Sequence, residues 1–152
     1  MSDVAPDDSD AGSWRAASID WSRRPRPRST PLTEPFWDAL RHGRLAIQRC
    51  LTCGGWRWPP QLACPSCLSE AYRWVATAGL GRLYSYTVVH RPVDPAGFDP
   101  PYVVGVVELD EGPRLLTNIV DCPFDELRID LRVALRVVAH DDALNLYPFA
   151  PV

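Results

Sequence analysis

The sequence predicts a mainly β fold with one short helix, a small metal-bound ribbon of hairpins and a five-stranded antiparallel barrel. Three observations lead to this prediction. Four cysteines form two C-x-x-C pairs, five later segments alternate apolar and polar residues, and one segment carries the start and stop signals of a helix. We expect residues 1–31 to form a disordered arm, residues 32–78 the helix and ribbon, and residues 79–152 the barrel.

The expected arm is rich in Asp, Ser, Ala and Pro, and it includes the run RRPRPR at Arg23–Arg28. This run is typical of a solvated polyproline-like segment, and the alternative is a segment that lies on a partner or an anionic ligand. The acidic start of the chain does not have the pattern of a signal peptide, and no run of eighteen apolar residues predicts a membrane span. We therefore expect a cytoplasmic protein that does not enter a membrane.

A helix is predicted in the segment LTEPFWDALRHG. Thr33 suits the N-cap, Pro35 suits the first turn, and Gly43 suits the position after the last turn. Three apolar side chains share one face at helical spacing: Phe36, Trp37 and Leu40. This face either packs on the core or docks on a partner protein, so Phe36 and Trp37 are candidate partner contacts.

The most specific motif is CLTCGGWRWPPQLACPSC, whose two C-x-x-C pairs supply four candidate metal ligands: Cys50, Cys53, Cys64 and Cys67. Four thiolates at the corners of a tetrahedron suit zinc, and a closed shell of this kind leaves no position for a reactive water. We therefore predict a structural zinc ion, with iron at a rubredoxin-like site as the redox alternative. An apparent metal-binding free energy of about 10–16 kcal/mol can hold such a small unit folded.

Alternating segments predict the strands of both parts. Ribbon strands are expected at Leu45–Cys50 and Tyr72–Thr77. Five barrel strands are expected at Gly81–Arg91, Tyr102–Leu109, Arg114–Val120, Val133–Ala139 and Leu144–Phe149. The segment CPFDEL, between the third and fourth of these, suits one short helical turn with Pro123 at its start. Five strands with a helical insert at this place indicate an OB-fold.

No set of catalytic residues is recognisable in the sequence. The fifth cysteine, Cys122, would need a neighbouring base to act as a nucleophile, and no known motif surrounds it or His140, the nearest histidine. We therefore predict that Cys122 is a buried structural thiol. All 16 basic residues are arginine, which excludes Schiff-base chemistry by a lysine of this chain. We assign no catalytic residue and expect no turnover by the chain alone.

A long proline-rich loop, Pro92–Tyr102, joins the first two barrel strands. Phe98 either caps the end of its own barrel or, together with Tyr102, faces a partner enzyme and its acyl-CoA ligand. His90 and Arg91 lie at the base of the loop and are candidates for contact with a phosphate or a carboxylate. These four residues are the predicted substrate or partner contacts of the barrel.

The charge distribution argues against nucleic-acid binding, although zinc ribbons and OB-folds can both bind nucleic acids. Residues 80–152 contain 6 arginines and 11 acidic residues, a balance of −5. Residues 45–79 contain 3 arginines and 1 glutamate, a balance of +2. The barrel therefore has the wrong sign for a protein that binds the phosphate backbone. A nucleic-acid-binding or scaffold module is the alternative class of function.

The order of short motifs resembles a known family. The chain contains, in sequence, PFW, CxxCG, PP, CPxC, YSYTVVH, PYVV and VELDEG. This order resembles the bacterial and archaeal zinc-ribbon OB-fold proteins called domain of unknown function 35, over about residues 31–152. The resemblance implies that the four cysteines of the ribbon are zinc ligands. Leu68 and Asp130 depart from the family pattern, because members often have glycine at these two positions.

Members of that family are auxiliary subunits of enzymes that act on acyl-CoA thioesters. The resemblance therefore implies a thiolase-fold partner, with acyl-CoA at or near the interface. Its most specific version is a subunit of an aldolase that cleaves steroid side chains, and a hot-dog-fold enoyl-CoA hydratase is the alternative partner. We expect a non-catalytic subunit that helps substrate binding and complex assembly.

Overall fold

The computed structural model describes residues 19–91 and 97–152 and confirms a mainly β fold, with one short α-helix in these two ranges. The strands form three groups: a three-stranded sheet, a closed five-stranded barrel and a two-stranded sheet. None of the helices in the described part of the chain is long and apolar enough to cross a membrane.

Helix α1, Glu34–Arg41, begins and ends where the capping signals predict. Thr33 precedes it but makes no capping hydrogen bond through its side chain, a proline lies in the first turn, and Gly43 follows the helix with φ +71°. Glycine adopts this left-handed conformation without strain and so ends the helix. Phe36 and Leu40 on one face of the helix are buried.

The ribbon is an antiparallel sheet in which β1 lies between β2 and β3. Its strands are β1 Ala46–Cys50, β2 Trp56–Arg57 and β3 Tyr72–Ala76. β1 pairs with β3 from Ala46 opposite Ala76 to Cys50 opposite Tyr72. Both predicted ribbon strands are confirmed to within one residue. Cys50 ends the central strand, so the first C-x-x-C turn begins where the sheet fixes the backbone.

The barrel closes from five strands in the order β10, β6, β5, β4 and β7. Their bounds are β4 Leu80–Val89, β5 Tyr102–Leu109, β6 Arg114–Ile119, β7 Arg132–Leu135 and β10 Phe149–Pro151. A 3₁₀ turn, η4 at Phe124–Glu126, lies between β6 and β7 as the helical insert predicts. The expectation of a purely antiparallel barrel is corrected at one pair, because β10 runs parallel to β6 where Phe149 lies opposite Ile119.

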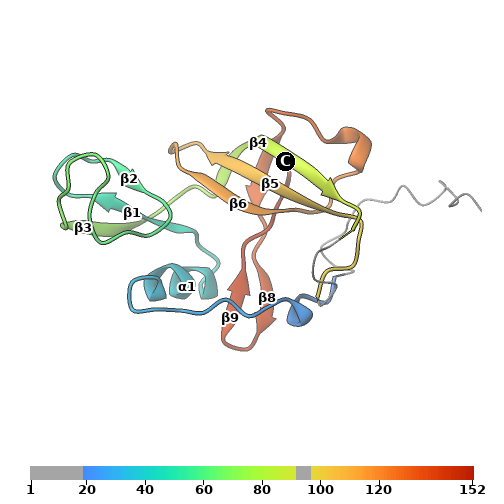
Figure 1. Cartoon of the computed structure of the whole chain (residues 1–152), viewed down its shortest axis with the longest axis horizontal. Helices are drawn as coiled ribbons and strands as arrows, with labels where there is room; N and C mark the ends of the chain where they lie inside the picture. Colours follow the sequence, from blue (N-terminus) through green and yellow to red (C-terminus); the bar gives the residue numbers. More distant parts are fainter. Residues whose placement is uncertain (1–18, 92–96) are drawn as a thin grey trace, which may run out of the picture.

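The predicted fourth and fifth barrel strands are each divided in the structure, which is a second correction. The residues between β7 and β10 form a separate hairpin that packs on α1 (Figure 1). Its strands are β8 Val138–Asp141 and β9 Leu144–Leu146. Asn145 Nδ2 donates a hydrogen bond of 3.0 Å to the Leu40 carbonyl oxygen. No sequence signal marks where the chain leaves the barrel after Leu135, whereas Pro148 marks its return before β10.

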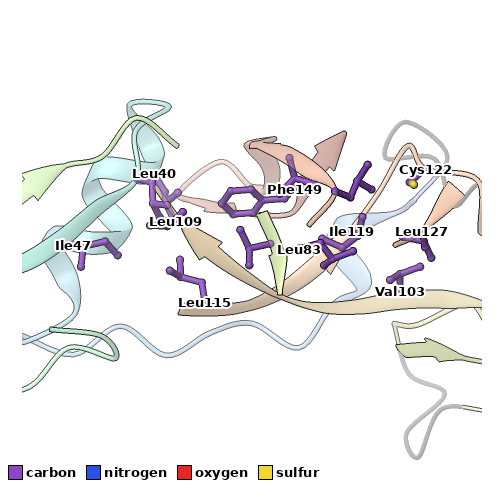
Figure 2. Close-up of a cluster of buried hydrophobic side chains, with 14 of the residues drawn as sticks. Leu40, Ile47, Leu83, Val103, Leu109, Leu115, Ile119, Cys122, Leu127 and Phe149 are labelled. Atoms are coloured by element: carbon purple, nitrogen blue, oxygen red, sulfur yellow. The ribbon is translucent and has the colours of Figure 1, made fainter. Parts of the chain in front are cut away.

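One apolar core runs from the helix and ribbon into the barrel (Figure 2). Buried side chains fill the barrel interior: Leu83, Val103, Val107, Leu115, Ile119 and Phe149. Leu40 of α1 and Ile47 of β1 extend the same cluster toward the ribbon. Since the ribbon contributes to the barrel's own core, folding of the metal-binding part and of the barrel are coupled through direct contact.

The segment of residues 19–31, which we call the arm, corrects the expectation that residues 1–31 are disordered. Residues 1–18 lie outside the described residues. The arm contains a 3₁₀ turn, η3 at Trp21–Arg23, and Trp21 is buried with only 7% of its surface exposed. Trp21 packs in a second, smaller core that includes Tyr102 of β5. The buried Trp21 ring holds the arm against the barrel, although the average composition of the arm is that of a solvated chain.

Polar contacts also fasten the arm to the rest of the chain. His140 Nε2 donates a hydrogen bond of 2.9 Å to the Arg24 carbonyl oxygen, and Arg26 forms an ion pair with Asp141. The Arg24 guanidinium lies 3.6 Å from the centroid of the Phe98 ring, a cation–π contact. The arm thus links the loop that precedes β5 to the β8–β9 hairpin.

We expect Gly97→Ala to loosen the arm, because Gly97 lies directly against the arm backbone. A methyl group at Gly97 would overlap the Arg23 carbonyl group, and Gly97 itself has φ +85°. Gly43→Ala is the matched control, since Gly43 has φ +71° and open space around the added methyl. The control should cost about 1–2 kcal/mol for its left-handed backbone, and Gly97→Ala should cost more. Urea denaturation measures both, and equal losses would contradict the close approach.

Candidate metal centre and partner-contact residues

The four predicted ligands converge between the two C-x-x-C turns. Their sulfur atoms all lie within 4.8 Å of one another. Two pairs have Sγ–Sγ distances of 3.6 Å: Cys50 with Cys67, and Cys53 with Cys64. A tetrahedral site with zinc–sulfur bonds of about 2.3 Å separates its sulfurs by about 3.8 Å. The arrangement therefore fits a zinc ion held by four thiolates.

The two C-x-x-C turns have the same backbone arrangement. The Gly54 amide donates to the Cys50 carbonyl oxygen at 3.1 Å, and the Leu68 amide donates to the Cys64 carbonyl oxygen at 2.8 Å. Gly54 has φ +73° and Leu68 has φ +60°. Leu68 thus takes the left-handed conformation that glycine often supplies at this position, and Asp130 does the same with φ +64°. Both departures from the family pattern keep the backbone turn.

Arg57 is a buried cation beside the metal centre, and it was not among the residues predicted for the site. Its side chain has 0% exposed surface and lies on β2. The guanidinium donates hydrogen bonds to three carbonyl oxygens, at 3.2, 2.7 and 3.0 Å: Leu62, Ser69 and Ala71. The neighbouring Cys50 side chain raises the pKa of Arg57. An arginine between two tryptophans on a short ribbon strand is the one signal that could have indicated this role.

The surroundings of the centre lower the pKa of two ligands, Cys50 and Cys64. The Ser69 amide lowers the pKa of Cys67, but burial and the other three sulfurs outweigh it and raise this pKa to about 11. The backbone amide of Cys53, followed by the Arg57 guanidinium, lowers the pKa of Cys50 to about 5. Zinc with four thiolates carries a net negative charge, which a buried guanidinium offsets. Because all four positions of a tetrahedral ion are taken by sulfur, the ion would hold the two turns together and would not activate water.

The two predicted contacts on α1 have different environments. Phe36 is buried, with its ring centroid 4.9 Å from that of Trp58 and 5.3 Å from that of Tyr147. Trp37 lies at the edge of the same cluster, with its centroid 6.2 Å from that of Tyr147, and is partly exposed. Phe36 is therefore part of the core, and Trp37 is the member of the pair that reaches the surface.

The four predicted contacts of the barrel also differ in their surroundings: two pack beside each other under the arm, and two are exposed. Tyr102 is buried under the arm, and Phe98 packs beside it with ring centroids 4.9 Å apart. His90 and Arg91 are exposed after the end of β4. Residues 92–96 of the predicted loop lie outside the described residues. Phe98 thus lies between Tyr102 and the Arg24 guanidinium of the arm.

A hollow of about 400 Å³ brings two of these predicted contacts together, Trp37 of α1 and Phe98. Its walls come from the arm, α1, β6 and the connection between β9 and β10. No sequence pattern predicts that Trp37 and Phe98 line one hollow, because this depends on the arm crossing the outside of the barrel.

The fifth cysteine and the nearest histidine are engaged with different partners. Cys122 is buried, its thiol donates to the Pro123 carbonyl oxygen at 3.4 Å, and burial raises its pKa. His140 instead contacts the Arg24 carbonyl oxygen and Asp141. A raised thiol pKa opposes formation of a thiolate nucleophile, so this environment suits a structural cysteine.

The fold and the metal centre together define a zinc-ribbon OB-fold protein. Residues 37–73 match the family described as "ChsH2, rubredoxin-like zinc ribbon domain", and residues 74–138 match "ChsH2, C-terminal OB-fold domain". The chain belongs to this family, the DUF35 proteins of the ChsH2 type. The match confirms the predicted fold, and together with the sulfur geometry it confirms the predicted structural zinc.

Curated relatives carry several functional names. The probable enoyl-CoA hydratase alpha subunit of Thermomonospora curvata is 43% identical over 84% of this chain, which spans only 40% of that relative. A DUF35 domain-containing scaffold protein of Methanothermobacter thermautotrophicus is 39% identical over 56% of this chain and 65% of that relative. The benzoylsuccinyl-CoA thiolase subunit BbsA of Thauera aromatica is 33% identical over 59% of this chain and 60% of that relative.

One solved structure contains a chain that this protein matches over nearly the whole length of that chain. A chain of the structure titled "Ltp2-ChsH2(DUF35) aldolase" is 42% identical, with a TM-score of 0.76. The match covers 83% of this chain and 98% of that chain. Ribbon and barrel are therefore arranged alike in the two proteins.

Proposed function

We propose that this chain is a non-catalytic subunit of a thiolase-fold enzyme that makes or breaks carbon–carbon bonds in acyl-CoA thioesters. The observation that carries the proposal is the match to the chain of the Ltp2-ChsH2(DUF35) aldolase, which extends over 98% of that chain. The thiolase-subunit name of the BbsA relative supports the same class of partner. On this reading the zinc stabilises the fold, and the reacting groups come from the partner.

The most specific form of the proposal is a retro-aldol cleavage of a steroid side-chain CoA ester, with the acyl-CoA at or near the subunit interface. The aldolase title of the structural match supports this form. An enoyl-CoA hydratase partner is the second candidate, because the Thermomonospora curvata relative bears that name at 43% identity. Residues 80–152 have a net negative charge, so nucleic-acid binding is a weaker candidate than either enzyme partner.

We expect the purified chain alone to leave acyl-CoA thioesters unchanged, because its metal has no open position and its only buried free thiol outside the centre has a raised pKa. Co-expressed with the thiolase-fold protein encoded nearest to it, the chain should co-purify and support cleavage of an acyl-CoA aldol substrate. Mass spectrometry of the products measures the reaction. The partner expressed alone is the control.

Robust cleavage by the zinc-loaded chain alone would contradict the proposal. Failure to form a complex with the thiolase-fold protein, combined with a stable complex with a hydratase subunit, would favour the second candidate.

A further inference from the structure

The four sulfur ligands of the metal centre differ in their access to solvent. Cys50 and Cys64, the first cysteine of each C-x-x-C turn, are buried, whereas Cys53 and Cys67, the second of each turn, are exposed. The buried Arg57 lies next to both buried sulfurs, since each of them raises its pKa. A reagent in solution therefore reaches Cys53 and Cys67 before it reaches the two sulfurs beneath them.

The short contacts between sulfurs each join one exposed cysteine to one buried cysteine of the other turn. Cys53 Sγ lies 3.6 Å from Cys64 Sγ, and Cys67 Sγ lies 3.6 Å from Cys50 Sγ. Oxidation of cysteine is site-selective for accessible thiolates, and a sulfenic acid condenses with a neighbouring thiol to a disulfide. Each contact thus places a second sulfur where it can attack the product of the first oxidation.

We propose that Cys53 and Cys67 are oxidation sites for hydrogen peroxide or an organic hydroperoxide, and that Cys64 and Cys50 resolve them as two disulfides between the turns. Formation of these disulfides consumes all four ligands and releases the zinc ion. The reaction needs only the zinc-loaded chain and the peroxide, so it goes beyond the proposed function and does not depend on the partner enzyme.

The oxidation at Cys53 proceeds in two balanced steps. The Cys53 thiolate attacks one oxygen of the peroxide, so that an S–O bond forms, the O–O bond breaks and hydroxide leaves. The Cys64 thiolate then attacks the sulfenic sulfur, so that the S–S bond forms, the S–O bond breaks and a second hydroxide leaves. Two thiolates lose two electrons, and the peroxide is reduced to two hydroxides, which take up protons to become water. Cys67 and Cys50 react in the same way with a second peroxide.

Loss of the metal changes the fold beyond the ribbon. The free energy of zinc binding is folding free energy in a unit of this kind, and Ile47 of β1 packs in the core that the ribbon shares with the barrel. The two disulfides join the same pair of turns that the metal joins, so a reductant and zinc together can restore the ribbon. The centre is thereby a reversible redox switch of the fold.

The first test adds two equivalents of hydrogen peroxide to the zinc-loaded wild-type chain, as two disulfides require, with a chromogenic chelator present. About one zinc per chain should be released, since one tetrahedral site holds one ion. Mass spectrometry after alkylation of the remaining thiols should find the pairs Cys53–Cys64 and Cys50–Cys67. The buried Cys122 is the internal control and should be recovered alkylated. Dithiothreitol and zinc should then restore the zinc content.

The second test covers the Cys53 sulfur with a methyl group. In Gly55→Ala the added methyl lies 3.3 Å from Cys53 Sγ, and Gly55 does not have a left-handed φ. At a limiting peroxide dose with dimedone to trap sulfenic acids, the ratio of label at Cys53 to label at Cys67 should fall by about threefold or more, because oxidation follows exposure. Gly43→Ala is the control, since its methyl enters open space, and it should keep the wild-type ratio.

Two results with the wild-type chain would overturn the proposal: retention of zinc under excess peroxide, or disulfides formed mainly within the turns, as Cys50–Cys53 and Cys64–Cys67. An unchanged labelling ratio in a Gly55→Ala chain with full zinc content would also overturn it, because exposure of Cys53 would then not direct the reaction. If Gly55→Ala fails to bind zinc, the disulfide pairs of the wild type decide. None of these results bears on the proposed function, which the complex with a thiolase-fold subunit tests separately.

Discussion

Removal of the zinc ion should unfold the ribbon and destabilise the whole chain. The ribbon has three short strands, and its two C-x-x-C turns are joined through the four sulfurs at the metal centre. A structural zinc site contributes an apparent binding free energy of about 10–16 kcal/mol at neutral pH, which is comparable to the total stability of a small domain. Because Ile47 of β1 belongs to the shared core, loss of the ribbon should also expose the barrel core.

Elemental analysis should give about one zinc per chain, as one tetrahedral site requires. After chelation, hydrogen exchange should show loss of protection in β1, β2 and β3 before the barrel strands. Cys50→Ala should have the same effect without a chelator. Cys122→Ala is the matched control, because this buried cysteine lies outside the centre, and it should keep full zinc content. A chelated chain that keeps its ribbon protected and still binds its partner would contradict a structural role for the metal.

Local signals in the sequence predicted those parts of the fold that short-range chemistry determines. The C-x-x-C spacing fixed the ligand set, because two short turns can each present a pair of sulfurs to one ion. The proline in the first turn and Gly43 after the last turn marked the limits of α1, and alternation predicted β5 at Tyr102–Leu109 residue for residue. In each case the determining interactions lie within a few residues of one another along the chain.

Features that depend on distant contacts were not predictable in the same way. The arm is ordered from residue 19 because Trp21 reaches Tyr102, a residue far along the chain, whereas composition describes only the average of the segment. The hollow exists because that arm crosses the barrel beside α1. Similarly, the division between β7 and β8 reflects packing of a hairpin on α1, which the apolar alternation of the segment does not encode.

Arg57 is the residue of the candidate site that sequence reasoning missed, and its removal should weaken zinc binding strongly. Its guanidinium is held by the carbonyl oxygens of Ser69 and Ala71 in the second half of the ribbon, and its presence lowers the pKa of Cys50. Substitution of residues that orient or neutralise metal ligands typically lowers metal affinity by roughly 10–100-fold. We expect Arg57→Met to fall in this range, with a lower melting temperature. Competition with a chromogenic chelator measures the affinity.

Two variants make this test specific. Arg73→Met is the matched control, because Arg73 also lies in the ribbon, on β3, but its side chain is exposed. It should bind zinc about as tightly as the wild type. Arg57→Lys should restore only part of the affinity, since an ammonium group keeps the charge but cannot reach the same set of acceptors as a planar guanidinium. Wild-type zinc affinity in Arg57→Met would show that the buried cation does not stabilise the thiolates. Full recovery in Arg57→Lys would mean that charge alone, without the geometry of the guanidinium, is sufficient.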